Sequence, residues 1–469
     1  MTIAETESNL YHFRPPDDFV LDPWQQKGID FLVPRKKAIL ADQMGIGKTI
    51  QVLKAHAIWQ PPRTLISGSK NSTYTWMKEL QKYYPNLAKT AVFIRGTPAQ
   101  RKRAWNNFDQ GIAIITYGVM KSDVDVISAM KWDAMYCDEA QKMKNKKTQT
   151  YKAAKQIVLK ARPPIVVPVT GSPAKRGPQD TWTLFNLVKP DMFPSYWQYI
   201  NHFCVIDNNG FGQEIIGVQN MEEFRRVTGE VLIRRLKMEV NPNMPKKRRS
   251  IVPIEMTGQQ AKLYRKMCED MIAEVDSGYM VASTVLTSIL RLRQLLTCPK
   301  LWGPEFDVGG AIEAMMEHMD DEELDKAVMF TSFPAAFPFF RYYIESKGFV
   351  VLQLRGGMEP EEIGKVIEAF EKPGKMVVML SIPFAESFDL VPAQAGYFIG
   401  PDYDPEANYQ AEDRIHRRTL KHDVDMFYFQ HQKTTEMELF DILNEKVRNT
   451  KPMFHSPQAL KEILMATIK

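Results

Sequence analysis

The chain alternates short, uniformly apolar runs with longer stretches in which apolar and polar residues recur at helical spacing. Such runs are typical of parallel strands that are buried on both faces, and the longer stretches are typical of the helices that cover them. In the first part of the chain, this pattern predicts strands over 64–66, 91–94, 112–115, 135–137 and 165–169. It therefore predicts an α/β unit with a parallel sheet wrapped by helices.

The same alternation returns after residue 327, with strands predicted near Val328, Val350, Val377 and Tyr397. We expect an α/β fold class with two RecA-like lobes and helical protrusions between them. The predicted parts are lobe 1 over 1–175, its helical protrusion over 176–240, an interlobe linker over 241–258, a second helical protrusion over 259–326, lobe 2 over 327–443, and a helical tail over 444–469.

A glycine-containing segment, LADQMGIGKTIQ at 40–51, carries the first candidate chemistry. Gly45 and Gly47 let the backbone curl around phosphate oxygens, and the helix expected near Thr49 presents its positive end to the same anion. Lys48 would reach the outer phosphates, and the Thr49 hydroxyl would ligate magnesium. The alternative is an ordinary turn that caps a helix. The predicted cofactor-binding residues of this loop are Asp42, Gln43, Met44, Gly45, Ile46, Gly47, Lys48 and Thr49.

A carboxylate pair follows a second apolar run, 132–137. This run predicts a buried strand that delivers Asp138, Glu139 and Gln141 to the carboxyl edge of the sheet, where open α/β sheets bind ligands. Asp138 is placed to hold magnesium, and Glu139 to orient and deprotonate the attacking water. Isolated Asp-Glu pairs are common on solvated helices, but the phosphate loop upstream favours the catalytic interpretation.

Two arginines far along the chain lie in the segment QAEDRIHRR at 410–418. In a helix, Arg414 and Arg417 share one face, so both guanidinium groups could point at the γ-phosphate of a nucleotide in the transition state. The alternative is an amphipathic helix with a basic outer face. The long separation from the phosphate loop indicates two lobes with the nucleotide in the cleft between them.

Together with LDPWQQKGIDFL at 21–32, CDEAQKMKN at 137–145, VTGSP at 169–173 and LIRRLK at 232–237, these segments resemble the Swi/Snf family of superfamily-two DNA translocases. The likeness is to compact, stand-alone bacterial or phage members. It implies ATP and magnesium as cofactors and double-stranded DNA as partner. Gln25 would read the adenine base, and Gln410 would line the nucleotide site. The resemblance implies coupling of hydrolysis to DNA through Gln141, Thr170 and Gly171, and DNA contacts at Lys70, Trp76, Thr116, Tyr117, Ser332 and Ser381.

The expected function is an ATP-dependent translocase that moves along duplex DNA and remodels DNA or protein–DNA complexes. One alternative is a strand-separating helicase, which uses the same two lobes. Another is a DNA-binding adaptor with weak ATPase activity, because SIPFAESFDL at 381–390 keeps Ser381 and Glu386 but lacks the family's glycines. A small-molecule kinase would not explain the second lobe.

The composition narrows the picture only slightly. Lysine and arginine number 61 against 56 acidic residues, so contacts with DNA must come from local basic clusters. One cluster, KKRR at 246–249, predicts a hydrated linker or, second, a phosphate contact. The four scattered cysteines indicate reduced thiols and no structural metal. No apolar run approaches the roughly 18 residues of a membrane helix. We expect a cytoplasmic monomer, in a bacterium or an infected host, with a protein partner as a further expectation.

Overall fold

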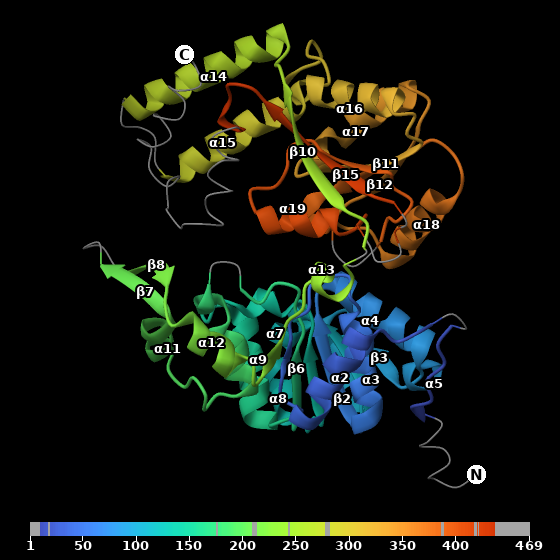
Figure 1. Ribbon diagram of the computed structural model, residues 1–469, viewed down its shortest axis with the longest axis vertical. Coiled ribbons are helices and arrows are strands. Elements are labelled where there is room, and N and C mark those ends of the chain that lie inside the picture. The colour runs from blue at the N-terminus through green and yellow to red at the C-terminus, as the bar shows by residue number, and fades with distance from the viewer. Residues whose placement is uncertain are drawn as a thin grey trace. The chain divides into compact units, whose positions relative to one another are not determined.

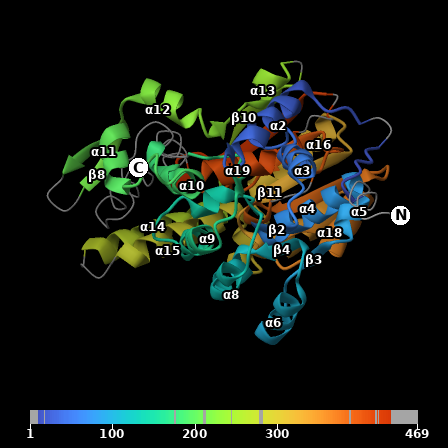
Figure 2. The ribbon, with the colours of Figure 1, turned by 90° about the horizontal axis from the view of Figure 1, so that it is seen from below.

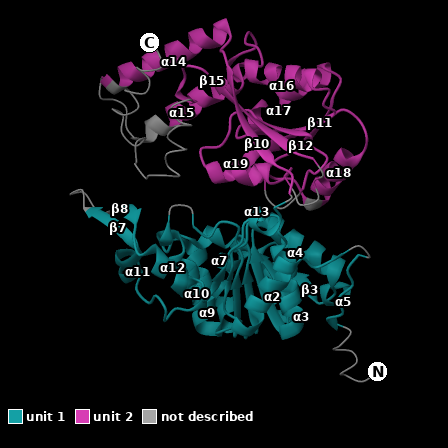
Figure 3. Cartoon of the chain, viewed as in Figure 1, with its two compact units in different colours: residues 1–243 teal, residues 244–469 magenta. Residues whose placement is uncertain are grey.

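A computed structural model shows that the chain divides into two compact units, residues 1–243 and 244–469 (Figures 1 and 3). The structure describes residues 10–16, 19–174, 177–208, 213–242, 244–276, 282–385, 389–416, 420 and 422–436. Each unit contains a parallel sheet with helices on both faces, which confirms the predicted α/β class with two lobes.

The sheet of the first unit has the strand order β3-β4-β2-β5-β6 among the described residues, and all neighbours are parallel. The strands are Ala91–Phe93 (β3), Gly111–Thr116 (β4), Arg63–Gly68 (β2), Ala134–Cys137 (β5) and Ile165–Pro168 (β6). They coincide with the five apolar runs that predicted them. Parallel bridges from Lys37 and Leu40 to β6 add the short strand β1 (Ile39–Leu40), which pairs with β9 (Leu232–Ile233).

Alternating side chains of these strands face two separate apolar cores. Ile66, Ile114 and Tyr136 pack on one face, where helices α2, α3 and α4 lie side by side (Figure 2). Leu65, Ala113 and Met135 are among the strand residues in the core of the opposite face. The helices of the first face are Pro23–Arg35 (α2), Lys48–Trp59 (α3), Lys70–Tyr83 (α4) and Pro85–Ala88 (α5); those that follow are Pro98–Asn107 (α6), Tyr117–Ser122 (α7), Val124–Ala129 (α8), Gln149–Ala161 (α9) and Trp182–Val188 (α10).

The stretch predicted as a purely helical protrusion, 176–240, contains strands as well. Helices Tyr196–Phe203 (α11) and Met221–Thr228 (α12) flank an antiparallel hairpin of Cys204–Asn208 (β7) and Gln213–Val218 (β8), and Lys237–Val240 (α13) follows β9. The β-branched residues Val205, Ile206 and Ile215 favour extended structure, which explains why the aromatic pattern alone gave an incomplete prediction. The aromatics Trp182, Phe185, Tyr199 and Phe203 belong to the core of this unit, whereas Trp197 is 53% exposed.

The second unit has the parallel order β10-β15-β14-β11-β13-β12 among the described residues. Its strands are Lys247–Ile254 (β10), Val424–His431 (β15), Ala395–Phe398 (β14), Lys326–Thr331 (β11), Met376–Ser381 (β13) and Val350–Leu354 (β12). Helices Gly310–Asp321 (α16) and Phe337–Ser346 (α17) share one core, and Pro360–Glu371 (α18) and Pro405–Glu412 (α19) share the other. The four strands predicted by apolar runs are all present.

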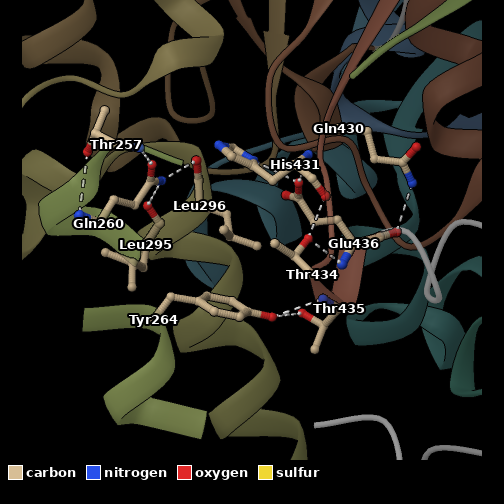
Figure 4. Close-up of polar contacts among 10 residues, drawn as sticks. All are labelled: Thr257, Gln260, Tyr264, Leu295, Leu296, Gln430, His431, Thr434, Thr435 and Glu436. Carbon is tan, nitrogen blue, oxygen red and sulfur yellow. Dashed lines mark hydrogen bonds and ion pairs between the residues drawn. The ribbon is translucent and has the colours of Figure 1, made fainter. Parts of the chain in front are cut away.

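Two long helices, Gly258–Asp276 (α14) and Ala282–Thr297 (α15), form the predicted helical addition of this unit. The Gln260 amide donates to the carbonyl oxygens of Leu295 and Leu296, at 3.0 and 3.3 Å (Figure 4). The Tyr264 hydroxyl donates to Thr435, at 3.2 Å, just beyond β15. The helical pair is therefore fixed to the carboxyl end of the sheet by buried polar contacts.

The predicted linker over 241–258 is corrected by the structure, because Lys247–Ile254 is strand β10 in full parallel register with β15. Arg248 donates to Asp425 from Nε, at 2.7 Å, and Arg249 donates to Glu412 from Nε, at 2.6 Å. The basic run KKRR is thus an edge strand in ion pairs, since its charges find acidic partners far along the sequence.

No helix in the described part of the chain is long and apolar enough to cross a membrane. Within that part, no group of three or more His, Cys, Asp or Glu side chains is arranged to hold a metal ion. The predicted C-terminal tail over 444–469 lies outside the described residues.

Candidate nucleotide-binding site

The candidate phosphate loop runs from the end of β1 into the start of α3. Gly45 and Gly47 have φ values of 84° and 81°, in the left-handed region that glycine adopts without strain. Gly47 is the N-cap of α3, so Lys48 and Thr49 occupy the first turn of a helix whose N-H groups point toward the loop. The Lys48 ammonium lies over the loop, 3.4 Å from the carbonyl oxygen of Gln43. This backbone can surround an anion.

Gly171 approaches the same loop closely from the end of β6. A Cβ placed on Gly171 would come within 2.7 Å of the Met44 side chain and 3.6 Å of the Lys48 nitrogen. A larger residue at 171 would therefore fill the space beside the lysine. Gly171 is thus adjacent in the fold to Met44 and Lys48 of the loop. Its predicted part in coupling hydrolysis to DNA needs such proximity.

Asp42 was predicted to bind the nucleotide, and in the structure its side chain is occupied by contacts within the protein. Its side chain is 0% exposed, and both carboxylate oxygens accept hydrogen bonds from the Arg235 guanidinium, with Nε to Oδ1 at 2.9 Å. The Gln51 amide also donates to Oδ2, at 3.1 Å. A carboxylate engaged in this way connects the start of the loop to Arg235 and Gln51.

Gln25 lies against the loop. Its amide nitrogen donates to the Ile46 carbonyl oxygen at 3.3 Å, and its amide oxygen accepts from the Asp22 backbone at 3.0 Å. A Cβ on Gly47 would meet this amide at 2.2 Å, which explains glycine at that position beyond its φ value. The predicted contact of Gln25 with adenine stays a prediction.

Asp138 and Glu139 follow β5 at the carboxyl edge of the sheet, next to the phosphate loop. Asp138 Oδ2 accepts from the Trp76 indole at 3.0 Å, and Oδ1 accepts from the Glu139 backbone at 2.9 Å. Burial and the neighbouring Glu139 raise the pKa of Asp138 to about 6, while Lys48 and the Trp76 hydrogen bond oppose that shift. A half-buried carboxylate beside a second carboxylate favours a cation as its partner.

A chain of hydrogen bonds joins Glu139 to the end of β6. The Gln141 amide donates to the Glu139 carboxylate, and the Thr170 hydroxyl donates to Gln141 Oε1 at 2.7 Å. Glu139 has a φ of 51°, which non-glycine residues rarely adopt and which turns its side chain back toward Gln141. The structure therefore joins Glu139, Gln141 and Thr170 by hydrogen bonds, and the coupling role given to them by the family resemblance stays a prediction.

The residues of the second unit in this prediction lie around the end of α19. This helix ends at Glu412, so Arg414 lies in the turn beyond it and not in the helix that was predicted for it. The helix stops because residues 413–416 close as a turn, with the Arg414 N-H on the carbonyl of Ala411. Arg414 is 1% exposed, and its Nε donates to the Gln410 carbonyl oxygen at 3.1 Å. Arg417 lies outside the described residues.

Three of the predicted DNA contacts are buried. Trp76 is 0% exposed because its indole donates to Asp138, and Tyr117 is buried with its hydroxyl donating to the Asp138 carbonyl oxygen. Ser381 is 5% exposed because it closes the interior strand β13. Thr116 is partly buried, its hydroxyl caps α7 by accepting from the Val119 N-H, and its contact with DNA stays a prediction.

The other two predicted DNA contacts remain predictions. Lys70 is exposed at the first residue of α4. Ser332 follows β11 and donates to Asp402 at 3.1 Å. Arg235 and Trp76 are the residues of this region whose part the sequence did not reveal, because their partners lie far away along the chain.

The residues present in the first unit fit a magnesium–nucleotide complex. The loop amides, Lys48 and Thr49 supply the phosphate side, and Asp138 supplies one carboxylate. Magnesium is commonly held by one or two carboxylates together with substrate phosphates and water. The positive φ values of the two glycines and the close approach of Gly171 leave the loop open where a side chain would otherwise stand.

A phosphate loop that opens a helix, with a carboxylate pair on a nearby parallel strand, defines a P-loop nucleoside triphosphate-binding protein. The SNF2-related domain family matches residues 24–301, and the helicase conserved C-terminal domain matches residues 310–419. Since the first match alone covers more than half of the 469 residues, the chain belongs to the SNF2-related family.

Individual relatives are distant in sequence. A probable chromatin-remodeling complex ATPase chain of Oryza sativa subsp. japonica is 24% identical over 90% of this chain and 40% of its own length. An uncharacterized ATP-dependent helicase of Mycoplasma genitalium is 24% identical over 87% of this chain and 39% of its own length. The human DNA annealing helicase and endonuclease ZRANB3 is 24% identical over 96% of this chain and 42% of its own length. The chain thus spans about 40% of the length of these curated relatives.

Among solved structures, the SWI2/SNF2 ATPase core of Sulfolobus solfataricus in complex with dsDNA is 24% identical. It covers 91% of each chain with a TM-score of 0.45. The same core domain without DNA is 22% identical, with a TM-score of 0.42.

Proposed function

We propose that this protein hydrolyses ATP and uses the reaction to move along double-stranded DNA. The observation that carries the proposal is the joint arrangement of the phosphate loop, Lys48 and the Asp138–Glu139 pair at one edge of the first sheet. Membership in the SNF2-related family supports it, since relatives carry names such as chromatin-remodeling ATPase and ATP-dependent helicase. ATP supplies the free energy, and magnesium neutralises charge on its phosphates.

In this proposal, the first unit binds ATP and activates water. The loop amides and Lys48 hold the phosphates, while Thr49 and Asp138 hold the metal. Glu139 orients water and accepts its proton, with its carboxylate fixed by the Gln141 amide. Because Thr170 bonds the other end of Gln141, a shift at the end of β6 changes the orientation of the general base. That link is the proposed route by which DNA binding raises ATP turnover.

The second unit contributes arginines in the proposal. Arg414 and Arg417 stabilise charge on the γ-phosphate, an effect that is worth about 10³ to 10⁵ in rate for such residues. The DNA contacts are proposed to be electrostatic and to reach the sugar–phosphate backbone of the duplex. Exposed groups such as Lys70 take part in them.

Two assays on the purified chain test the proposal. Triplex displacement measures movement along a duplex, and unwinding of a forked duplex measures strand separation; Lys48→Ala is the control for both. We expect ATP-dependent triplex displacement by the wild type and none by Lys48→Ala. Unwinding of the fork would favour a strand-separating helicase instead. Duplex binding with equally low ATP turnover in both proteins would favour the adaptor alternative and contradict the proposal.

A further inference from the structure

A partly buried cation near the phosphate loop, Arg235, comes from the segment that follows β9 and makes several hydrogen bonds. Its Nε donates to Asp42 Oδ1 at 2.9 Å, and Nη2 donates to Asp42 Oδ2 and to Gln51 Oε1, the latter at 2.9 Å. Nη1 donates to the Trp24 carbonyl oxygen. One guanidinium therefore joins α2, the start of the phosphate loop and the first turns of α3.

Gln51 extends the contact to the far end of the loop. Its amide nitrogen donates to Asp42 Oδ2 and to the Gly47 carbonyl oxygen, both at 3.1 Å. The side chains of Asp42 and Gln51 are 0% exposed, so water does not compete for these bonds. The two ends of the loop, Asp42 and Gly47, are thereby fixed at a set distance.

The main chain around Arg235 follows the loop as well. The Gln43 N-H donates to the Arg235 carbonyl oxygen at 3.0 Å, and the Lys237 N-H donates to Gln43 Oε1 at 2.8 Å. Gly28 on α2 supplies the room for this cluster, because a Cβ there would stand 1.8 Å from Gln51 Oε1 and 2.7 Å from Arg235 Nη2. The cluster is thus built from four separate segments of one unit.

The charge of Asp42 gives the cluster its purpose. A generic phosphate loop has glycine at this position, whereas here a buried carboxylate stands at the base of a loop that would bind a polyanion. Without a counter-charge, Asp42 would either repel phosphate or have to be protonated. Arg235 supplies that counter-charge in a bidentate geometry that lysine cannot reproduce.

We propose that Arg235 is the positioning residue of the phosphate loop: it neutralises Asp42 and, through Gln51, sets the loop geometry that binds the triphosphate. The inference rests on the proposed function of this site. It goes beyond that function in assigning nucleotide affinity to a residue that touches neither nucleotide nor metal.

Three variants and a matched control test the proposal. Arg235→Gln leaves Asp42 charged, Asp42→Asn/Arg235→Gln removes both charges, and Gly28→Ala displaces the Gln51 amide while all charges stay. The control is Arg101→Gln/Asp123→Asn. That pair is also bidentate, with bonds of 2.8 and 2.9 Å. The Arg101 side chain is 13% exposed, as is that of Arg235. Arg101 lies on α6 and Asp123 at the end of α7, so the control pair is away from the loop.

The readouts are the equilibrium Kd for Mg-ADP, the KM and kcat for ATP, and the melting temperature. We expect Arg235→Gln to raise Kd and KM at least ~10-fold, which corresponds to a loss of about 1.4 kcal/mol of binding free energy. The change in kcat should be smaller. Adding Asp42→Asn should recover part of that affinity, and Gly28→Ala should weaken binding at an almost unchanged melting temperature. The control should lower the melting temperature and leave Kd within twofold.

The outcomes separate the two proposals. If the wild type binds Mg-ADP and all three variants bind it within twofold, the positioning role is overturned while the proposed function stands. An equal loss in the Arg101–Asp123 control shows a general effect on folding and overturns it as well. If the wild type itself binds no nucleotide, the proposed function fails, and the inference fails with it. Should Arg235→Gln not fold, Gly28→Ala and the double variant decide the question.

Discussion

The phosphate loop of the first unit and the arginine-bearing turn of the second each depend on a buried carboxylate that is paired with basic side chains, but the number of cations differs. In the first unit, one arginine, Arg235, neutralises one carboxylate within a cluster of amides. In the second, the buried carboxylate of Glu412 accepts from Lys247 at 2.7 Å, from Arg249 at 2.6 Å and from the Tyr428 hydroxyl at 2.8 Å. The loop carboxylate thus has one cation and the Gln51 amide as partners, whereas the carboxylate at the turn is shared by two cations.

The comparison also shows where the chain between the units is attached. Arg235 lies shortly before the boundary at residue 243, and Lys247 and Arg249 lie shortly after it. His416, in the turn that follows α19, places Nε2 2.8 Å from the carbonyl oxygen of Pro245. Each side of the boundary is thus bonded to an element of its own unit that is proposed to act on the nucleotide.

The largest effect should come from the general base. Glu139→Gln keeps the contact with Gln141 but removes proton acceptance, so ATP turnover should fall by about 10² to 10⁴. Nucleotide affinity should stay near that of the wild type. Single-turnover hydrolysis and nucleotide binding would be measured together. Wild-type turnover in this variant would refute the role of Glu139.

The charge-based anchor of the second unit should be costly to break. Glu412→Ala leaves Lys247 and Arg249 without their shared buried partner. Because the Arg249 side chain is 44% exposed and Lys247 keeps Asp413 at 3.3 Å, we expect a loss of about 1.5 to 3 kcal/mol in the stability of this unit. Hydrogen exchange of peptides from β10 and α19 would report it. The control is Glu345→Ala, which removes an exposed pair with Arg341 at 3.8 Å and should cost about 0 to 1 kcal/mol. Equal losses would contradict the proposed anchor.

Trp76→Phe should weaken the metal side of the site. The ring packing stays, but Asp138 loses the indole hydrogen bond, which for a charged acceptor is worth about 1.5 to 3 kcal/mol. Magnesium dependence of ATP turnover should therefore shift to concentrations about tenfold higher or more. Trp105→Phe is the matched control, because its indole donates to Asp123 at 2.8 Å, away from the loop. A similar shift in both variants would count against a specific role of Trp76.

The smallest expected effect is the loss of folding stability in acid, which should occur over different pH ranges in the two units. Burial lowers the pKa of His56 to about 3, so between pH 6.5 and 3 the unfolded state binds the extra proton. The contribution of His56 to the stability of the first unit should then fall by about 1.4 kcal/mol per pH unit below 6.5. The raised pKa of Asp138 acts in the opposite direction below pH 6, so the slope of His56→Gln, measured against that of the wild type, isolates the His56 contribution. Seven of the eight tryptophans precede residue 243, so fluorescence during denaturant unfolding reports mainly on this unit. An unchanged slope in His56→Gln would contradict the assignment.

The Glu412 contribution titrates in a different range. Burial acts to raise its pKa, but the hydrogen bond from Arg249 and the nearby Lys247 lower the pKa below the usual value of a glutamate. Its stabilisation is therefore complete above about pH 4.5 and is lost only as the pH falls through the lowered pKa. Between pH 6.5 and 5, this contribution does not change.

Local patterns predicted the sheet strands and the loop well, because parallel strands buried on both faces are apolar throughout and glycines mark the turn. Strand β10 escaped prediction because Lys247, Arg248 and Arg249 look solvated until their partners at 412 and 425 are placed. Trp76 was misassigned for the same reason, since Asp138 lies 62 residues away. A charge or indole that serves a distant partner has the same local sequence as one that faces water.

The most direct test of two units acting on one nucleotide is Arg417→Ala, measured for duplex-stimulated ATP turnover and for nucleotide and DNA affinity. We expect turnover to fall by about 10³ or more, with both affinities near those of the wild type, because the guanidinium acts on the transition state. Unchanged turnover, or equal losses in turnover and affinity, would contradict the account.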